Sequence, residues 1–370
     1  MATLPAAEFF NTDPSQIIAE SVAYYEGLTG RKLSPGQAEM LLINAFAYRE
    51  QITRVAANEA ARQNLLSYAR YPMIDYLGEL VGVTRLPASK ALCSIQFTLV
   101  PGHGALTIPE GIRVQSTDGR VVFITLEAKT VQPSDATATV LAECTTEGKA
   151  GNGYEVGDIV IILDPQAYVS SAINTAITSG GADEEDDDAL RERIRLAPSG
   201  FSCAGPKGAY VFFAKSAHPA IIDVGVMSLV PGTVNVFPLL ENGETPSQEI
   251  IDAIYGKLND EKIRPLNDTV VVDAPEKVFY TIDVQLTLYT GAITGPTVEQ
   301  VTKNLQAYAD DRKVRLGRDA VRSQISALSQ LKDLVYSVNV VSPASDVHVD
   351  FSQIAYCTGI NVTVSGYSNE

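Results

Sequence analysis

The sequence predicts an α+β multidomain protein with an N-terminal long-helix region, a small all-β module and two tandem α+β units with antiparallel sheets. Two observations lead to this class. The apolar residues recur at helical spacing before residue 85, at the two-residue spacing of strands from 92 to 163, and at both spacings afterwards. A chain of 370 residues is also too long for one ordinary hydrophobic core. The predicted divisions are the helical region 1–85, the all-β module 86–180, the acidic α+β domain 181–276 and the C-terminal α+β domain 277–370.

One uninterrupted helical stretch dominates the N-terminal region. Residues 37–71 contain neither glycine nor proline, and residues 34–36 (SPG) form a helix-start signal. Six residues recur at the spacings of a coiled-coil seam: Ala38, Leu41, Ala45, Tyr48, Ile52 and Val55. A second apolar row holds Leu42, Phe46 and Leu66, so residues 15–25 and 74–80 are candidate covers within the chain. Two alternatives follow, a self-contained helical hairpin and a bundle with other chains.

Four strand-like segments define the all-β module, at residues 94–100, 121–125, 136–142 and 159–163. Glycine-rich and proline-rich turns separate them, so the module is of the kind that displays loops. Residues 148–153 (GKAGNG) resemble a phosphate cradle in composition only. Because β-like residues follow them instead of a helix, we predict a turn there.

The acidic domain begins with a predicted hinge at residues 179–181 (SGG) and a helix over 182–196. In this helix acidic residues precede three arginines, an order that suits the helix dipole. An α-β-β-α-β unit follows, with helices at 208–217 and 247–258 and strands at 221–229, 233–239 and 269–274. A hairpin backed by two helices is expected to bury only one face of its sheet.

The C-terminal domain is predicted to use similar parts and to pack beside the first unit. We expect a long strand at 278–289, helices at 297–308 and 318–328, and strands at 335–341, 347–351 and 359–364. No repeat is visible at the level of residues. The segments 221–239 and 335–349 are the expected strand edges for self-association.

The composition is that of a globular protein, with 45% hydrophobic and 19% charged residues. A formal net charge of −16 argues against nucleic acid or an anionic membrane as the main partner. No apolar run reaches the ~18–20 residues that span a bilayer, and the first residues lack the features of a signal peptide. We therefore expect synthesis in the cytoplasm. Four cysteines without close spacing predict reduced thiols: Cys93, Cys144, Cys203 and Cys357.

No stretch carries a convincing pattern for chemistry, so we predict no catalytic, cofactor-binding or metal-binding residues. The acidic run 183–188 lacks the glycine turn of a calcium loop, and residues 200–204 (GFSCA) lack the strand-turn-helix context of a nucleophile elbow. His103, His218 and His348 are too dispersed to form a metal site. We expect His218 at a helix C-terminus, favourable there when protonated. Two alternatives stay open, a carboxylate-dependent hydrolase on the acidic domain and a calcium-dependent binding module.

Two charged clusters are candidate contacts between two copies of the chain. The acidic cluster includes Asp187 and Asp188, and the basic cluster over 312–322 includes Arg315 and Arg318. An acidic protein surface is a more natural target for these arginines than nucleic acid. Pairing of this kind acts mainly on the rate and orientation of association.

An ordered set of short motifs resembles the baseplate J-like proteins of contractile phage tails and related injection systems. The motifs lie at residues 108–116 (IPEGIRVQS), 147–153 (EGKAGNG), 180–194, 208–210 (GAY), 231–236 (PGTVNV), 264–266 (RPL) and 270–275. The resemblance covers about residues 20–365. The family commonly has threonine where this chain has Ile112, a difference that concerns packing only.

The resemblance implies a structural role without catalytic residues. It implies a virion protein of the tail baseplate, assembled in the host cytoplasm, that forms part of the baseplate wedge. Its expected partners are another copy of itself, a second wedge protein bound through the N-terminal helices, and sheath-side and hub-side baseplate proteins. Wedges joined in this way form a ring around the hub.

Overall fold

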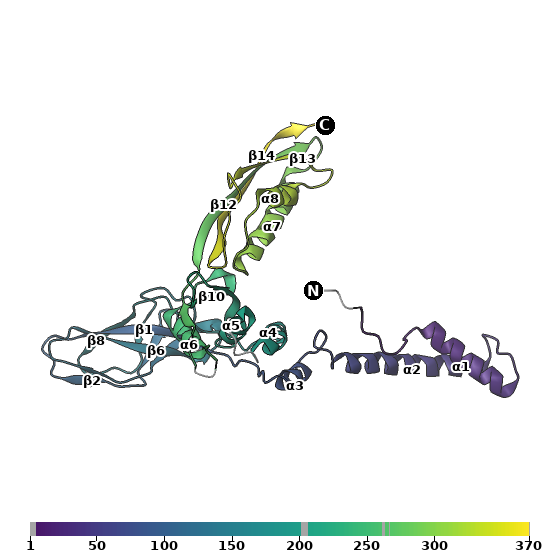
Figure 1. Ribbon diagram of the computed structural model, residues 1–370, viewed down its shortest axis with the longest axis horizontal. Coiled ribbons are helices and arrows are strands. Elements are labelled where there is room, and N and C mark those ends of the chain that lie inside the picture. The colour runs from purple at the N-terminus through teal and green to yellow at the C-terminus, as the bar shows by residue number, and fades with distance from the viewer. Residues whose placement is uncertain (1–4, 201–205, 261–262, 266, 370) are drawn as a thin grey trace. The chain divides into compact units, whose positions relative to one another are not determined.

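The computed structural model describes residues 5–200, 206–260, 263–265 and 267–369 (Figure 1). The motifs at 200–204 and 264–266 and the residue Cys203 lie wholly or partly outside this range. The chain divides into two compact units, which are treated separately here. The first contains residues 1–84 with 190–194, and the second contains residues 85–189 with 195–370.

The first unit consists mainly of the helices α1 (Pro14–Thr29), α2 (Ala38–Arg62) and α3 (Met73–Glu79). The Asp13 carboxylate caps α1 by accepting the N–H of Ser15 (2.9 Å), and Gly30 ends the helix with a positive φ. α1 packs along α2. The three buried residues Ile17, Ala47 and Asn58 mark the sides on which these helices are covered.

α2 is shorter than predicted, because it ends at Arg62 and not near residue 71. The side-chain amide of Asn64 donates to the carbonyls of Ala60 (3.2 Å) and Ala61 (3.3 Å). A continuing helix would have paired those carbonyls with the backbone N–H groups of residues 64 and 65. The side chain therefore satisfies the end of the helix, and short turns lead to α3.

Part of helix α4 (Asp187–Gly200) completes the first unit. Leu190 is fully buried, and Ile194 packs against Gly78, where a Cβ would lie 3.3 Å from its side chain. Arg191 donates to the carbonyls of Leu66 (2.8 Å) and Ala69 (2.7 Å). Arg191 therefore joins the first part of α4 to the segment after α2.

The β-module forms the first part of the second unit, with a six-stranded sheet in the order β7-β3-β4-β6-β1-β8. The end strands β7 and β8 also contact each other, so the sheet nearly closes. The bounds are β1 (Lys90–Leu99), β2 (Leu106–Ile108), β3 (Arg113–Ser116), β4 (Val122–Thr125), β5 (Lys129–Val131), β6 (Thr137–Glu147), β7 (Ile159–Ile162) and β8 (Val169–Asn174). The four predicted strands are confirmed. The sequence analysis missed β2, β3, β5 and β8.

The predicted α-β-β-α-β unit is confirmed in its element order. Its elements are α5 (Lys207–Lys215), β9 (Ile221–Met227), β10 (Thr233–Leu240), α6 (Gln248–Leu258) and β11 (Thr269–Val272). The sheet order is β11-β10-β9, with β9 and β10 antiparallel and β10 and β11 parallel. The crossover through α6 makes the parallel pair possible, so this sheet is mixed and not purely antiparallel.

The C-terminal part has a second mixed sheet in the order β13-β12-β14 (Figure 1). Its elements are β12 (Glu276–Tyr289), α7 (Thr294–Lys313), α8 (Arg322–Ser329), β13 (Val335–Ser342) and β14 (Gln353–Ser368). β14 runs parallel to β12 along its whole length. Residues 347–351 are not a strand, because they make only the single bridge of Val347 to Ala320.

Both faces of the central sheet are buried, which corrects the expectation of one buried face. Helices α5 and α6 cover one face, where Ile254 and Leu258 are fully buried. On the other face, Phe237 and Leu239 share a core with Leu316 and Ile354 of the C-terminal part. The two α+β units therefore pack side by side, as predicted.

Three cysteines in the described chain are buried free thiols: Cys93, Cys144 and Cys357. Burial raises the pKa of the Cys93 thiol to about 12, so this thiol stays protonated and unreactive at neutral pH. Among the helices that the structure describes, we find none that combines the length and the apolar character needed to cross a bilayer.

The shared core depends on a close approach at Gly225, because a Cβ built there would lie 1.8 Å from the Phe351 carbonyl oxygen. We expect Gly225→Ala to destabilise the second unit by about 2 kcal/mol or more, since the strand and the 351 segment would have to separate. Gly256→Ala in α6 is the matched control. No atom lies within 4 Å of its Cβ position, so the substitution should stabilise by about 0.5–1 kcal/mol. Urea unfolding measures both, and equal effects would contradict the prediction.

Candidate interaction surfaces

The predicted seam on α2 lies on the exposed side of the helix. All six seam residues are exposed, including Leu41 at 63% and Val55 at 51% of their accessible surface. α1 covers a different side, on which Ala47 and Asn58 are buried. Successive residues are turned by about 100° around a helix, which places Tyr48 a quarter turn or more from Ala47. Around the circumference of α2, the exposed seam is therefore next to the side that α1 covers.

The second apolar row of α2 is also uncovered. Leu42 is 60% exposed and Phe46 is 71% exposed. Of the candidate covers within the chain, residues 15–25 pack as part of α1, and α3 buries Ile74. α2 thus presents apolar side chains on two further sides besides the side that α1 covers. An exposed apolar surface of this extent is typical of a protein interaction site.

A polar residue that the sequence analysis missed organises the N-terminal segment across α2. The Asn58 side-chain oxygen accepts the N–H groups of Phe9 (3.0 Å) and Phe10 (2.9 Å), and its amide donates to the Phe10 carbonyl (2.8 Å). Arg62 donates to the Ala7 carbonyl (2.8 Å). The only signal in the sequence is an asparagine on the same helical face as Ala47.

The helix predicted over 182–196 begins later, so most of the acidic run 183–188 precedes it. α4 begins at Asp187, and Asp186 caps it by accepting the N–H groups of Asp188 (2.9 Å) and Ala189 (2.8 Å). Glu185 is only 5% exposed and accepts the N–H of Leu86 (3.0 Å). Asp187 pairs with Arg85 at 2.7 Å. The described residues include no group of three or more potential metal ligands.

The basic cluster is also engaged within the chain. Arg318 pairs with Asp311 at 2.5 Å. Arg322 donates to the carbonyls of Val340 and Ala344, each at 2.7 Å. Arg315 is exposed, and we find no ion pair for it within the described residues. The predicted contact residues Asp187 and Arg318 thus each have a partner in the same chain.

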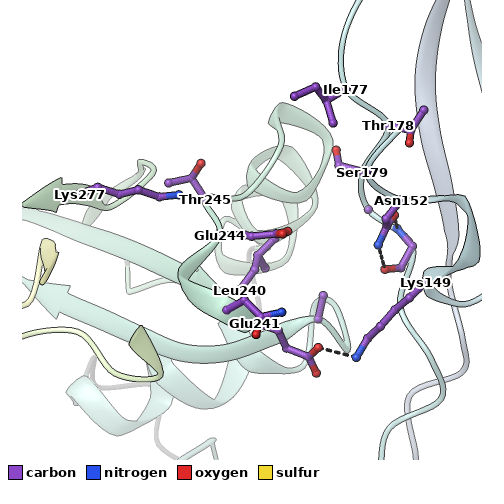
Figure 2. A pocket seen from close by; sticks show the side chains of 15 residues that line it. Lys149, Asn152, Ile177, Thr178, Ser179, Leu240, Glu241, Glu244, Thr245 and Lys277 are labelled. Atoms are coloured by element: carbon purple, nitrogen blue, oxygen red, sulfur yellow. Dashed lines mark hydrogen bonds and ion pairs between the residues drawn. The ribbon is translucent and has the colours of Figure 1, made fainter. Parts of the chain in front are cut away.

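A cleft of about 570 Å³ lies between the loops of the β-module and the end of β10 (Figure 2). Lys149 and Asn152 line it from one side, and Glu241 and Glu244 from the other. Lys149 forms an ion pair with Glu241 across the cleft. The described lining contains neither histidine nor cysteine, and Lys149 is engaged by Glu241.

Residues 179–181 are a close-packing site and not the predicted hinge. The Asn152 amide donates to the Gly181 carbonyl (2.7 Å), and the Gly181 N–H donates back to the amide oxygen (2.9 Å). A Cβ on Gly181 would lie 2.4 Å from the Gly148 carbonyl oxygen. The predicted turn at 148–153 is confirmed, with positive φ angles at Gly148 and Gly153. Glycine is needed here for contact between two backbones.

The turn that carries Glu241 also contacts the C-terminal part of the chain. Asn242 and Gly243 are consecutive residues with positive φ angles of 57° and 73°. A Cβ on Gly243 would lie 3.3 Å from the Tyr356 ring. The ammonium groups of Lys277 and Lys313 each lie 4.8 Å from the centre of that ring. The turn therefore joins the β-module, the central sheet and the C-terminal sheet.

The two sheet edges named by the sequence analysis are both occupied in part. On β9, a carboxylate oxygen of Asp223 accepts the N–H of Leu316 (3.0 Å). On β13, the carbonyls of Val335 and Val340 accept side-chain hydrogen bonds from Gln330 (2.5 Å) and Arg322 (2.7 Å). On β13 these side chains take backbone acceptor positions that a further strand would need, whereas on β9 the contact engages the side chain of Asp223 and not the backbone.

The histidines do not form a common site, but His103 has an informative geometry. It is 5% exposed, and its two ring nitrogens lie 2.8 Å from the carbonyl oxygens of Gly104 and Asp135. A carbonyl oxygen can only accept, so both contacts are hydrogen bonds only when the ring is doubly protonated. These two contacts raise the pKa of His103.

The expectation that His218 is favourable in its protonated form is wrong. Burial lowers the pKa of His218. Its Nδ1 accepts the N–H of Ala220 (3.1 Å), and a protonated nitrogen could not accept. His218 is therefore a neutral packing residue.

Comparison with protein families finds one family along almost the whole chain. The Baseplate J-like N-terminal domain matches residues 39–91, and the Baseplate J-like protein barrel domain matches 94–181. The Baseplate J-like central domain matches residues 202–274, and the Baseplate J-like protein C-terminal domain matches 280–363. The matches occur in this order and do not overlap.

The chain is also similar to individual phage and phage-like proteins. Baseplate protein J of Escherichia phage P2 is 32% identical over 199 residues, which are 54% of this chain and 65% of that protein. The match thus spans less than two thirds of the P2 protein. Phage-like element PBSX protein XkdT of Bacillus subtilis (strain 168) is 22% identical over 329 residues, which are 86% of this chain and 83% of that protein. A chain in the cryo-EM structure of the anti-feeding prophage baseplate aligns over 92% of this chain and 90% of its own length, with 15% identity and a TM-score of 0.42.

The geometry of His103 predicts a pH-dependent contribution to the stability of the β-module. Because its pKa is raised in the folded state, the contribution is fully present below the unfolded pKa of about 6.5 and is lost as the pH rises through the folded pKa. We expect the stability difference between the wild type and His103→Leu to be largest near pH 5.5 and to shrink above pH 8. Thermal melts of both proteins across this range measure it. A difference that stays constant with pH would contradict the assignment of a doubly protonated His103 ring in the folded state.

Proposed function

Because the chain belongs to the baseplate J-like family, we propose that it is a structural component of the wedge of a phage-tail or tail-like baseplate. It is a baseplate protein with a structural role. We further propose that it links wedges into a ring around the hub by self-association and by helix bundling. The single observation that carries this proposal is the uncovered apolar surface of α2.

The exposed seam supports helix bundling with other chains. Leu41, Tyr48 and Val55 lie on one side of α2, and Phe46 lies on another. Burying a leucine or phenylalanine side chain stabilises by ~1.5–3 kcal/mol, so a bundle that covers both sides is strongly favoured over the isolated helices. We propose that the helices of a second wedge protein, together with those of another copy, cover these two sides.

The proposed partners are another copy of the chain, a second wedge protein, and sheath-side and hub-side baseplate proteins. The proposed place of action is the tail baseplate of the virion, after assembly in the host cytoplasm. We also propose that the four-part division at residues 1–85, 86–180, 181–276 and 277–370 reflects separate contact modules.

Charged residues at the rim of the contact between copies complete this proposal. Asp187, Asp188, Arg315 and Arg318 would act there mainly on the association rate, since exposed ion pairs are worth only ~0–1 kcal/mol each. Arg315 is the best placed of them, because it is exposed, whereas Asp187 and Arg318 pair with Arg85 and Asp311.

The structure gives the hydrolase and calcium-module alternatives no specific support. The carboxylates of Glu185, Asp186 and Asp187 accept backbone hydrogen bonds or pair with an arginine. These contacts give the three carboxylates roles in capping and in joining segments of the chain. We therefore propose a non-enzymatic role.

Labelling of native particles tests the proposed function. We expect an antibody against the exposed loops of the β-module, detected with gold by electron microscopy, to label the baseplate end of the tail. Gold distributed along the tail tube, or absent from purified particles, would contradict the proposal. Pre-immune serum on the same particles is the control.

Substitution in the seam tests helix bundling. Val55→Asp places a charge on the apolar seam, so the lost burial of ~1.5 kcal/mol or more is joined by the cost of desolvating the carboxylate. We expect the variant to fold, because Val55 is exposed in the single chain, and to lose co-purification with its wedge partner. Glu59→Asp, at an exposed acidic position of the same helix, is the control. Unchanged co-purification of Val55→Asp would place the contact elsewhere.

A further inference from the structure

The sheet β13-β12-β14 has two edges, and they differ in how they are protected. The Arg322 and Gln330 side chains bond to carbonyls of β13, as described above. Within the described chain, three carbonyls of β14 accept hydrogen bonds from groups outside the ladder with β12. They belong to Gln353, Gly359 and Ser368. From Ile360 to Tyr367 the described part of the chain places no side chain on the outer carbonyls of β14. This half of the strand is therefore open to a further strand.

The open edge also lacks charge and proline. The residues of β14 (QIAYCTGINVTVSGYS) contain no Asp, Glu, Lys, Arg or Pro, in a chain that is 19% charged. Natural edge strands are usually protected by charged side chains, proline, bulges or covering segments. The ladder with β12 is irregular at Thr358 and at Ser365, so the regular stretch of this edge is Gly359–Val364. A regular edge without charge or proline is a template for pairing with another chain.

The side chains of β14 alternate in a pattern that is compatible with self-pairing. Ile360, Val362 and Val364 lie on the core face, where they are only half-buried. Asn361 and Thr363 lie exposed on the opposite face. In an antiparallel pair, residues directly opposite each other point to the same face of the sheet. Two copies of β14 related by a two-fold axis at Val362 would therefore place Ile360 opposite Val364 and Asn361 opposite Thr363.

We propose that β14 pairs antiparallel with β14 of a second copy of this chain, around Val362. The proposal rests on the proposed self-association and names its surface. The pairing joins two three-stranded sheets into one six-stranded sheet, and it finishes the burial of the three apolar side chains on the core face. A net charge of −16 repels two copies over most of their surface, so an uncharged strand is a favourable place for them to meet.

A covalent experiment reports the pairing directly. In the full-length chain, Val362→Cys places a thiol on the proposed two-fold axis, where Cβ atoms of opposite residues are ~4.5–5.5 Å apart. We expect mild oxidation to give a dimer linked through residue 362, identified by peptide mass. Ser337→Cys on β13 is the control and should not give a dimer. A dimer from the control alone, or from neither variant, would overturn the proposal.

A charge experiment tests the same edge without cross-linking. The parent is Val55→Asp, which removes the proposed helix contact. Adding Thr363→Lys places a charge on the open face of the edge, and we expect it to weaken self-association at least tenfold by analytical ultracentrifugation. Gln285→Lys is the matched control, because Gln285 pairs with Thr363 one strand further in and is also exposed. We expect the control to associate as the parent does. Equal association of both variants would overturn the assignment to β14.

The remaining outcomes separate this inference from the proposed function. A parent that stays monomeric at assembly concentrations would overturn both the β14 pairing and the self-association on which it rests. Gold labelling of the baseplate would still support the structural role in that case. If Val362→Cys in assembled particles links to a different protein, the edge has another occupant and the proposal of a second copy is wrong.

Discussion

The close contact between the Phe351 carbonyl and the backbone at Gly225 is the constraint on which the arrangement of the second unit depends. It fixes the segment before β14 against the second face of the central sheet, where Phe237 and Leu239 meet Leu316 and Ile354. A segment held in this way cannot also pair as a strand, which explains why residues 347–351 make only one bridge. β14 then begins immediately afterwards at Gln353 and runs parallel to β12 to the end of the sheet.

The same constraint determines which surfaces are left for other molecules. With both faces of the central sheet buried, this part of the chain has no apolar sheet face to offer a partner. α7 and α8 cover one face of the C-terminal sheet, and its other face carries hydrogen-bonded polar pairs such as Thr281 with Ser342. Two surfaces of the described chain stay open to a partner: an edge of that sheet and, in the first unit, the uncovered sides of α2. These two surfaces suit different contacts, since helices pack through side chains and strands pair through backbone groups.

The period of the apolar residues predicted the helices and the longer strands, because burial on one face directly imposes that period, but it missed β2, β3, β5 and β8. The hairpin β9-β10 and helix α6 were predicted for this reason. Contacts between residues far apart in the sequence could not be predicted. Arg85 pairs with Asp187 over 102 positions, and this pairing joins the acidic run to the segment that precedes the β-module. The end of α2 was missed because a single side-chain amide, that of Asn64, replaces the next helical hydrogen bonds.

The sequence predicted which residues form the seam, but it could not predict which side of α2 is covered by α1. A heptad pattern shows that Leu41 and Val55 share a side of α2, yet it cannot show which side α1 covers. Asn58 decides this, because its amide binds the backbone of Phe9 and Phe10 and so places the N-terminal segment on the side that α1 also occupies. A buried asparagine is costly unless its hydrogen bonds are satisfied, so this arrangement specifies one packing of the two helices. The apolar seam is then left exposed in the single chain, and this exposure is the basis of the proposed assembly with other chains.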